Sequence, residues 1–185
     1  MSYLESFMSA CDRTRDLGLA CPAVDSIETR YLNSSAAAKI PRAVKEHLGV
    51  LSDRDLVAQC CAIHFRLAPI ISKVLETEVI ITTGYVKLGQ RSIFEQSDDE
   101  LQRTLTEGLA GAPLKSHVWL TLPSMEILDF SLPTTVSVLN NVPGAGGVIA
   151  AHPDELLMGL SFHPQLVGTS YLEQIGAIRL VLDLA

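Results

Sequence analysis

The sequence predicts one mixed α+β domain, and three observations point to this fold class. The chain has 185 residues, of which 48% are hydrophobic, so it can bury a substantial core in a single domain. Apolar residues recur at helical spacing in the first part of the chain, whereas β-branched and alternating stretches follow later. No internal repeat and no linker interrupts the sequence. We therefore expect residues 1–185 to fold as a single unit.

Helical spacing and capping residues predict most of the helices. The long pattern that begins after the N-cap signature at Ser52 contains Pro69, which is expected to kink or restart the helix there. A further helix near the C-terminus is expected to run into a strand or tail over 167–184. The other helical stretches are 3–16, 34–49 closing at Gly49, and 97–111 stopping at Gly108 or Gly111.

Strand-like stretches alternate with these helices in the second half. VIITTGYVKLG (79–89) is rich in β-branched residues, and ELLMGLSFHP (155–164) also has strand character. The stretch between them at 132–153 is predicted to be a loop with a glycine cluster, NNVPGAGG. No Gly-Lys-Ser/Thr follows this cluster, so it is interpreted as a cleft wall or surface loop rather than a phosphate-binding loop.

The stretch SHVWLTLPSMEILDFS (116–131) predicts a tight β-hairpin. Its alternation places His117 and Trp119 on the same face of the first strand. If residues 123–125 form a three-residue loop, Trp119 lies opposite Asp129, and His117 is a diagonal neighbour of Asp129 on that face. An imidazole held by a carboxylate is useful mainly beside a third reactive group, which the rest of the chain has to supply.

Composition excludes several classes of function. The formal net charge is −7 and no basic stripe offsets it, which argues against binding to nucleic acid or to an anionic membrane surface. The N-terminal stretch does not resemble a secretion signal, and no segment is long and apolar enough to span a bilayer. Four scattered cysteines with no zinc-binding spacing indicate reduced thiols in a cytoplasmic protein, with no metal and no cofactor expected.

Two stretches together resemble the core motifs of the transglutaminase-like superfamily of papain-like thiol enzymes. In CAIHFRLAPIISKVLETEVIITTGYV (61–86), a cysteine opens an apolar helix and a strand ending in Gly-Tyr follows, with 23 positions from Cys61 to Gly84. HVWLTLPSMEILDFS (117–131) is similar to the second motif, in which His-x-Trp is followed by a short hairpin and an Asp. The resemblance covers 61–131. It implies a papain-like core, with N-terminal helices and a cysteine helix packed on an antiparallel sheet that carries the histidine and the acid.

The resemblance also implies a role for each matching residue. Cys61 corresponds to the nucleophile, His117 to the general base and Asp129 to the acid that orients the histidine. Gln59 is a candidate donor to an oxyanion, and Trp119 is a candidate substrate-binding residue that would cover the site. Cys60 projects about 100° away around a helix and is expected to take part in packing.

Activation of a cysteine in this position depends on where its helix begins. The helix dipole and the free N–H groups of a first turn activate a thiol there. We therefore expect a break between Arg54 and Cys60, because a continuous helix would leave Cys61 in its middle. The hairpin loop PSM lacks the glycine that the family often has, and His64 is interpreted as a helix-surface residue.

These observations predict a cysteine-dependent hydrolase that cleaves an amide, peptide or isopeptide bond through an acyl-cysteine intermediate. A peptide or protein is the expected substrate. Transfer of the acyl group to an amine and deamidation of glutamine use the same triad, so both remain alternatives. A non-catalytic protein-binding module on the same scaffold is the alternative from a different class, since a fold does not fix a function.

Overall fold

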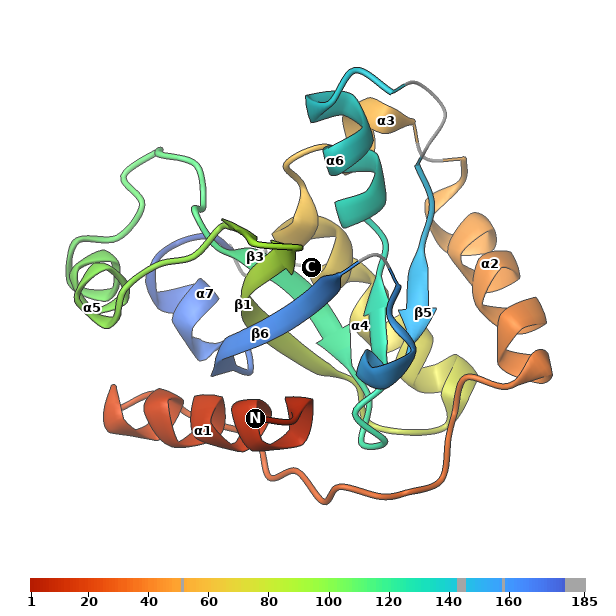
Figure 1. Cartoon of the computed structure of the whole chain (residues 1–185), viewed down its shortest axis with the longest axis horizontal. Helices are drawn as coiled ribbons and strands as arrows, with labels where there is room; N and C mark the ends of the chain where they lie inside the picture. The colour runs from red at the N-terminus through yellow and green to blue at the C-terminus, as the bar shows by residue number, and fades with distance from the viewer. Residues whose placement is uncertain (51, 143–145, 158, 179–185) are drawn as a thin grey trace, which may run out of the picture.

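An antiparallel sheet forms the centre of the fold (Figure 1). The computed structural model describes residues 1–50, 52–142, 146–157 and 159–178. Within them the strand order is β2-β1-β3-β4-β5. Strand β3 pairs with the first half of β1 and β2 with its end, both along one edge, and β6 pairs along the opposite edge of β1. The strands are β1 (Ile80–Leu88), β2 (Arg91–Ile93), β3 (His117–Thr121), β4 (Ile127–Asp129), β5 (Ile149–Ala151) and β6 (Leu160–Val167).

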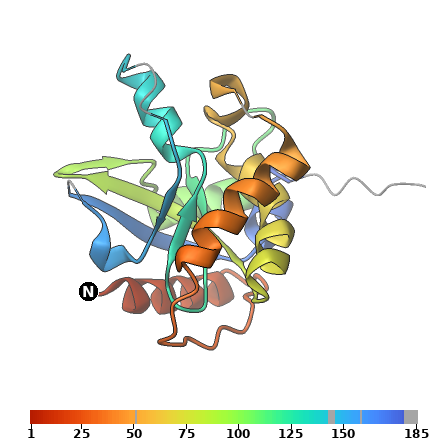
Figure 2. The same cartoon turned by 90° about the vertical axis from the view of Figure 1, so that its right-hand side faces the viewer.

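Helices cover both faces of this sheet. Helix α1 packs on one face, and α2 and α4 lie on another side of the sheet, as Figure 2 shows. A short 3-10 turn, η1 (Pro153–Glu155), precedes β6. The helices are α1 (Tyr3–Asp16), α2 (Ser34–Leu48), α3 (Asp53–Leu56), α4 (Cys60–Leu75), α5 (Asp98–Glu107), α6 (Leu132–Leu139) and α7 (Ser170–Gln174).

The alternation of β3 divides its side chains between two cores. Val118 and Leu120 join the larger core, which α2, α4, α5 and α7 cover. Trp119 joins the smaller core beneath α1, where Tyr3 and Phe7 pack against it. The sheet is thus buried on both faces, which explains why every residue of β3 is buried rather than every second one.

Most of the expected helices are present, and the expected break before the cysteine helix is confirmed. Helix α3 ends at Leu56, Ala58 has a left-handed backbone with φ 57°, and α4 begins at Cys60. Helix α4 runs through Pro69 without restarting there. Pro69 is exposed, so the hydrogen bond that its missing N–H would have made is lost at the solvent side of the helix.

The prediction of a loop over 132–153 is wrong. This stretch contains helix α6 and strand β5. Pro133 lies in the first turn of α6, where a backbone N–H has no partner within the helix, so proline starts this helix instead of preventing it. The tail expected after 178 lies outside the described residues.

Gly84 is the point where the sheet changes register. Strands β1 and β6 shift against each other between Thr83 and Gly84, while Gly84 pairs with His117 on the other side. A Cβ atom on Gly84 would lie 2.1 Å from the carbonyl oxygen of His163 and 2.9 Å from the Trp119 ring. Only glycine therefore lets the backbone of β6 come this close to β1 beside the histidine.

Replacement of Gly84 by alanine should lower the free energy of unfolding by about 3 kcal/mol, at the upper end of the range for overpacking, because a backbone carbonyl cannot move aside. Urea unfolding of Gly84→Ala measures this change. Gly147→Ala is the matched control, since a Cβ there meets no atom within 4 Å. Equal stability of the two variants would contradict the steric explanation.

Candidate active site

The β3–β4 hairpin has the register that its sequence predicts. Leu120 pairs with Leu128, and the Leu122 amide donates to the Glu126 carbonyl at 2.9 Å across the three-residue loop. Met125 takes the left-handed position that glycine often fills, with φ 63°, and its buried side chain packs into the smaller core. As a result, β3 begins and β4 ends at the same end of the sheet, and so His117 and Asp129 meet there.

His117 and Asp129 form a buried hydrogen-bonded pair. The distance from His117 Nε2 to Asp129 Oδ2 is 2.5 Å, and the two residues are 2% and 0% exposed. The other carboxylate oxygen accepts hydrogen bonds from the backbone amides of Ser131 and Leu132, both at 2.9 Å. One oxygen of Asp129 therefore accepts hydrogen bonds from the free backbone amides at the start of helix α6, and the other oxygen accepts the hydrogen bond from His117.

The pair shifts both pKa values in the direction that keeps both groups charged. Burial by itself lowers the pKa of His117, but the charge of Asp129 and the hydrogen bond to it raise this pKa to about 10. Burial by itself raises the pKa of Asp129, and the charge and hydrogen bond of His117 outweigh it and hold the pKa well below its usual range. The site thus contains a buried imidazolium beside a buried carboxylate.

The cysteine beside this pair is Cys60. Its sulfur lies 4.0 Å from the carbonyl oxygen of Ser116, the residue before His117, and after Asp129 it is the next group that raises the pKa of the His117 ring. Because Nε2 faces Asp129, Nδ1 is the ring nitrogen left to exchange a proton with the thiol. Cys60 is the first residue of α4 and is partly exposed.

The structure places Cys60, rather than the expected Cys61, beside the start of the His117 strand. Cys61 is the next residue along α4 and therefore projects about 100° away from Cys60 around the helix. Burial, followed by the neighbouring Cys60, raises the pKa of the Cys61 thiol to about 12, so this thiol stays protonated at neutral pH. Both cysteines pack against the larger core, and Cys60 is the one that lies beside His117 and Asp129.

The first turn of α4 is free to stabilise negative charge. Its N-cap residue, Gln59, makes no side-chain capping bond, and no acidic residue lies in this turn. Within the described residues, the amides of Cys60, Cys61 and Ala62 have no hydrogen-bond acceptor. By contrast, side chains cap the N-termini of α1, α2 and α5. Cys60 therefore lies in the positive field of an uncapped helix N-terminus.

Gln59 and Trp119 differ in their access to ligands. Gln59 is exposed and lines a hollow of about 350 Å³ together with Ala62 and Ile63 of the same helix turn. Trp119 is fully buried, with its ring 5.9 Å from that of His117, and its indole N–H donates to the Tyr3 hydroxyl at 2.8 Å. Trp119 therefore supports the histidine from within the smaller core and does not cover an open site.

Phe94 packs against the His117 ring as well. The two ring centres are 5.5 Å apart and the planes differ by 22°, while Phe94 itself has a left-handed backbone with φ 71°. Phe94 is only partly buried. Aromatic rings thus hold the imidazole in one orientation, and Phe94 is the one among them that reaches the surface beside it.

His64 is the residue of this region whose position the sequence interpretation missed. It is fully buried rather than on the helix surface, and its two ring nitrogens are bonded to the backbone at Cys60 and at Phe130. The spacing of Cys60 and His64, one helical turn apart, was the available signal.

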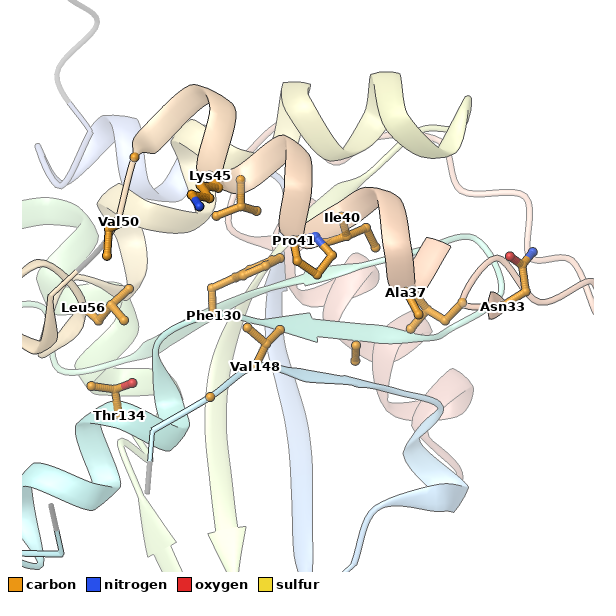
Figure 3. A pocket seen from close by; sticks show the side chains of 15 residues that line it. Asn33, Ala37, Ile40, Pro41, Lys45, Val50, Leu56, Phe130, Thr134 and Val148 are labelled. Atoms are coloured by element: carbon orange, nitrogen blue, oxygen red, sulfur yellow. The ribbon is translucent and has the colours of Figure 1, made fainter. Parts of the chain in front are cut away.

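The structure also contains a larger apolar cavity, whose lining residues Figure 3 shows. It has a volume of about 570 Å³ and is bounded by α2, Leu56, Phe130 and the segment around Val148. Neither Cys60 nor His117 lines it. Two residues that line the cavity are close to the Cys–His–Asp group in sequence. Phe130 directly follows Asp129, and Leu56 ends the helix before α4.

The described part of the chain holds no group of three or more His, Cys, Asp or Glu residues arranged to bind a metal ion. None of the helices in those same ranges is long and apolar enough to cross a membrane. No protein-family model, no curated protein and no solved structure matches this chain.

Replacement of Asp129 by asparagine should lower the free energy of unfolding by about 3–5 kcal/mol near pH 5–6, because it leaves a buried imidazolium without its counter-charge. His117 has a raised pKa in the folded state, so its contribution is full below about pH 6.5 and is lost as pH rises through about 10. Asp129 has a lowered pKa, so its contribution is lost as pH falls below about 3.9. The difference between wild type and variant should therefore shrink above neutral pH.

Urea unfolding from pH 4 to pH 10 measures this dependence. Asp154→Asn is the matched control, because the Asp154 carboxylate is exposed to solvent 3.4 Å from the His152 ring, and its loss should leave stability unchanged. A difference between wild type and Asp129→Asn that stays constant over this range would contradict the buried ion pair.

Proposed function

We propose that this protein is a cysteine-dependent hydrolase with Cys60 as nucleophile, His117 as general acid and base, and Asp129 as the group that orients the histidine. The observation that carries the proposal is the position of a thiol at the first residue of an uncapped helix, beside a histidine whose other ring nitrogen is bonded to a buried carboxylate. This is the nucleophile–base–orienter arrangement of cysteine acyl transfer.

The reaction follows from the positions of these three side chains. The Cys60 thiolate, paired with the His117 imidazolium, attacks the substrate carbonyl carbon. The C–N bond then breaks, the imidazolium gives its proton to the leaving amine, and a thioester to Cys60 remains. Water, with its proton taken by His117, attacks the thioester and releases the acid and the free thiol.

Two features of the structure should make Cys60 more reactive toward an amide than an isolated thiol. An imidazolium next to a thiol stabilises the thiolate, and Asp129 keeps His117 protonated over a wide pH range. The free amides in the first turn of α4 are suited to stabilise the oxyanion that forms on the carbonyl oxygen. Gln59, the residue before Cys60, is exposed at this end of α4, and Cys60 itself is partly exposed.

The substrate class is an amide, with a peptide or isopeptide bond as the preferred target. Water is the default acceptor for the acyl group unless a site excludes it. The chain order of cysteine, histidine and acid, with a His-x-Trp hairpin, also resembles the transglutaminase-like superfamily and supports a papain-like core. In that superfamily an amine can replace water, so transfer and deamidation are variants of the same proposal.

A non-catalytic binding module is the second candidate function. The observation that favours it is the deep burial of His117 and Asp129, together with an apolar cavity of about 570 Å³ that neither Cys60 nor His117 lines. Cavities of roughly 300–1,000 Å³ are typical of ligand sites. On this alternative the cavity would bind a partner, and the buried pair would only stabilise the fold.

Labelling with iodoacetamide separates the two functions. At pH 7 we expect Cys60 to react at least roughly tenfold faster than the other three thiols, because only Cys60 lies beside an imidazolium. Cys60→Ala should remove the fast phase, and Cys61→Ala, the matched control on the next residue, should retain it. Peptide mapping by mass spectrometry assigns the label.

Hydrolysis of a p-nitrophenyl ester provides the second readout. Wild type should form an acyl group on Cys60 and release it to water, and His117→Ala should slow this turnover by about 10²–10⁴-fold, the usual contribution of a general base. Four uniformly slow thiols, with no acylation of Cys60, would contradict the enzyme and leave the binding module.

A further inference from the structure

We infer that His64 is a positioning residue that fixes the nucleophile helix to the strand carrying the acid. This inference rests on the proposed function, because it concerns how Cys60 is held against His117 and Asp129. It adds a fourth side chain, which does not touch substrate and acts through the backbone on either side of the reacting group.

Two hydrogen bonds define the position of the His64 ring. His64 Nδ1 lies 2.7 Å from the carbonyl oxygen of Cys60, at the start of α4. The backbone amide of Phe130 donates to His64 Nε2 at 2.9 Å, immediately after Asp129. One ring therefore joins the residue that carries the thiol to the residue that follows the acid.

These partners also fix the protonation state of the ring. The Phe130 amide can only donate, so Nε2 accepts and carries no hydrogen. The Cys60 carbonyl can only accept, so Nδ1 carries the proton and donates it. Both bonds together require a neutral ring. Burial, opposed in part by Asp129, lowers the pKa of His64 to about 4, which agrees with this tautomer.

The neutral state keeps His64 from competing with His117 for the acid. His64 Nε2 is 3.5 Å from Asp129 Oδ1, but neither atom carries a hydrogen, so no ion pair forms between them. That oxygen accepts from Ser131 and Leu132 instead. The two buried histidines near Asp129 thus have separate tasks. His117 forms the ion pair with Asp129, and His64 holds the start of α4 at a fixed distance from the end of β4.

The start of α4 depends on such a connection. The helix has no side-chain cap, and the left-handed turn at Ala58 separates it from α3. The His64 ring is within the core, 6.4 Å from the His117 ring in an edge-on arrangement. Loss of the two bonds would leave the first turn of α4 without a direct hydrogen bond to β4, and Cys60 would be less well aligned with His117.

Two substitutions separate the two bonds. In His64→Asn, the amide nitrogen can take the place of Nδ1 and keep the bond to Cys60, whereas the bond to Phe130 is lost. In His64→Gln, the longer amide can accept from Phe130 in the place of Nε2, whereas the bond to Cys60 is lost. Neither variant keeps both bonds, so each breaks the connection at a different point.

The first readout is the rate of iodoacetamide labelling of Cys60 between pH 5 and pH 9. Both variants should slow it by about 10- to 100-fold at pH 7, the effect expected when a reacting group is misplaced by about 1 Å. Their pH–rate profiles should approach that of a simple thiol. His47→Gln is the matched control, since His47 Nδ1 also bonds the carbonyl four residues earlier on its own helix, far from the site in sequence.

The second readout is hydrogen exchange of the Phe130 amide, which does not depend on any catalytic activity. His64→Asn should speed this exchange at least roughly tenfold, because the amide loses its acceptor, and His64→Gln should leave it slow. Folded variants that keep wild-type labelling rates, or a Phe130 amide equally slow in both variants, would overturn the inference. A wild-type Cys60 that labels slowly while Phe130 behaves as expected would instead refute the proposed hydrolase and leave the connection intact.

Discussion

The buried pair of His117 and Asp129 is the constraint on which the rest of the site depends. Two opposite charges without solvent are stable only when their geometry is good and their remaining hydrogen-bonding positions are filled. The hairpin register supplies the geometry, and the amides at the start of α6 fill the second oxygen of Asp129. A shift of one residue in this register would turn one of the two side chains to the opposite face.

A polar network in the smaller core holds the histidine strand in place from behind. The Tyr3 hydroxyl accepts from the Trp119 indole and bonds the Thr121 hydroxyl, each at 2.8 Å, and Thr82 bonds Thr121 at the same distance. This network joins α1, β1 and β3. The strand that starts with His117 is also paired with β1 along its whole length, from Gly84 opposite His117 to Ile80 opposite Thr121.

Sequence reasoning reached the elements that depend on local pattern. The hairpin register follows from alternation and loop length, and the break before α4 was expected from the need for a helix start near the cysteines. The choice between Cys60 and Cys61 depended on the rotation of α4 about its axis, which tertiary packing sets and one residue of spacing cannot. The burial of His64 likewise depended on β4 passing over its side of α4, and α6 was missed because a Leu-Pro pair reads as a turn until Pro133 is placed in a first helical turn.

Two neighbouring histidines of this site are held in different states, His117 charged and His64 neutral. Nitrogen NMR of the protein with ¹⁵N-labelled histidine at pH 7 tests this difference directly, because the shifts of the two ring nitrogens report which of them carry hydrogen. We expect His117 to show both nitrogens protonated and His64 to show a proton on Nδ1 alone. A neutral His117, or a His64 protonated at Nε2, would contradict the account.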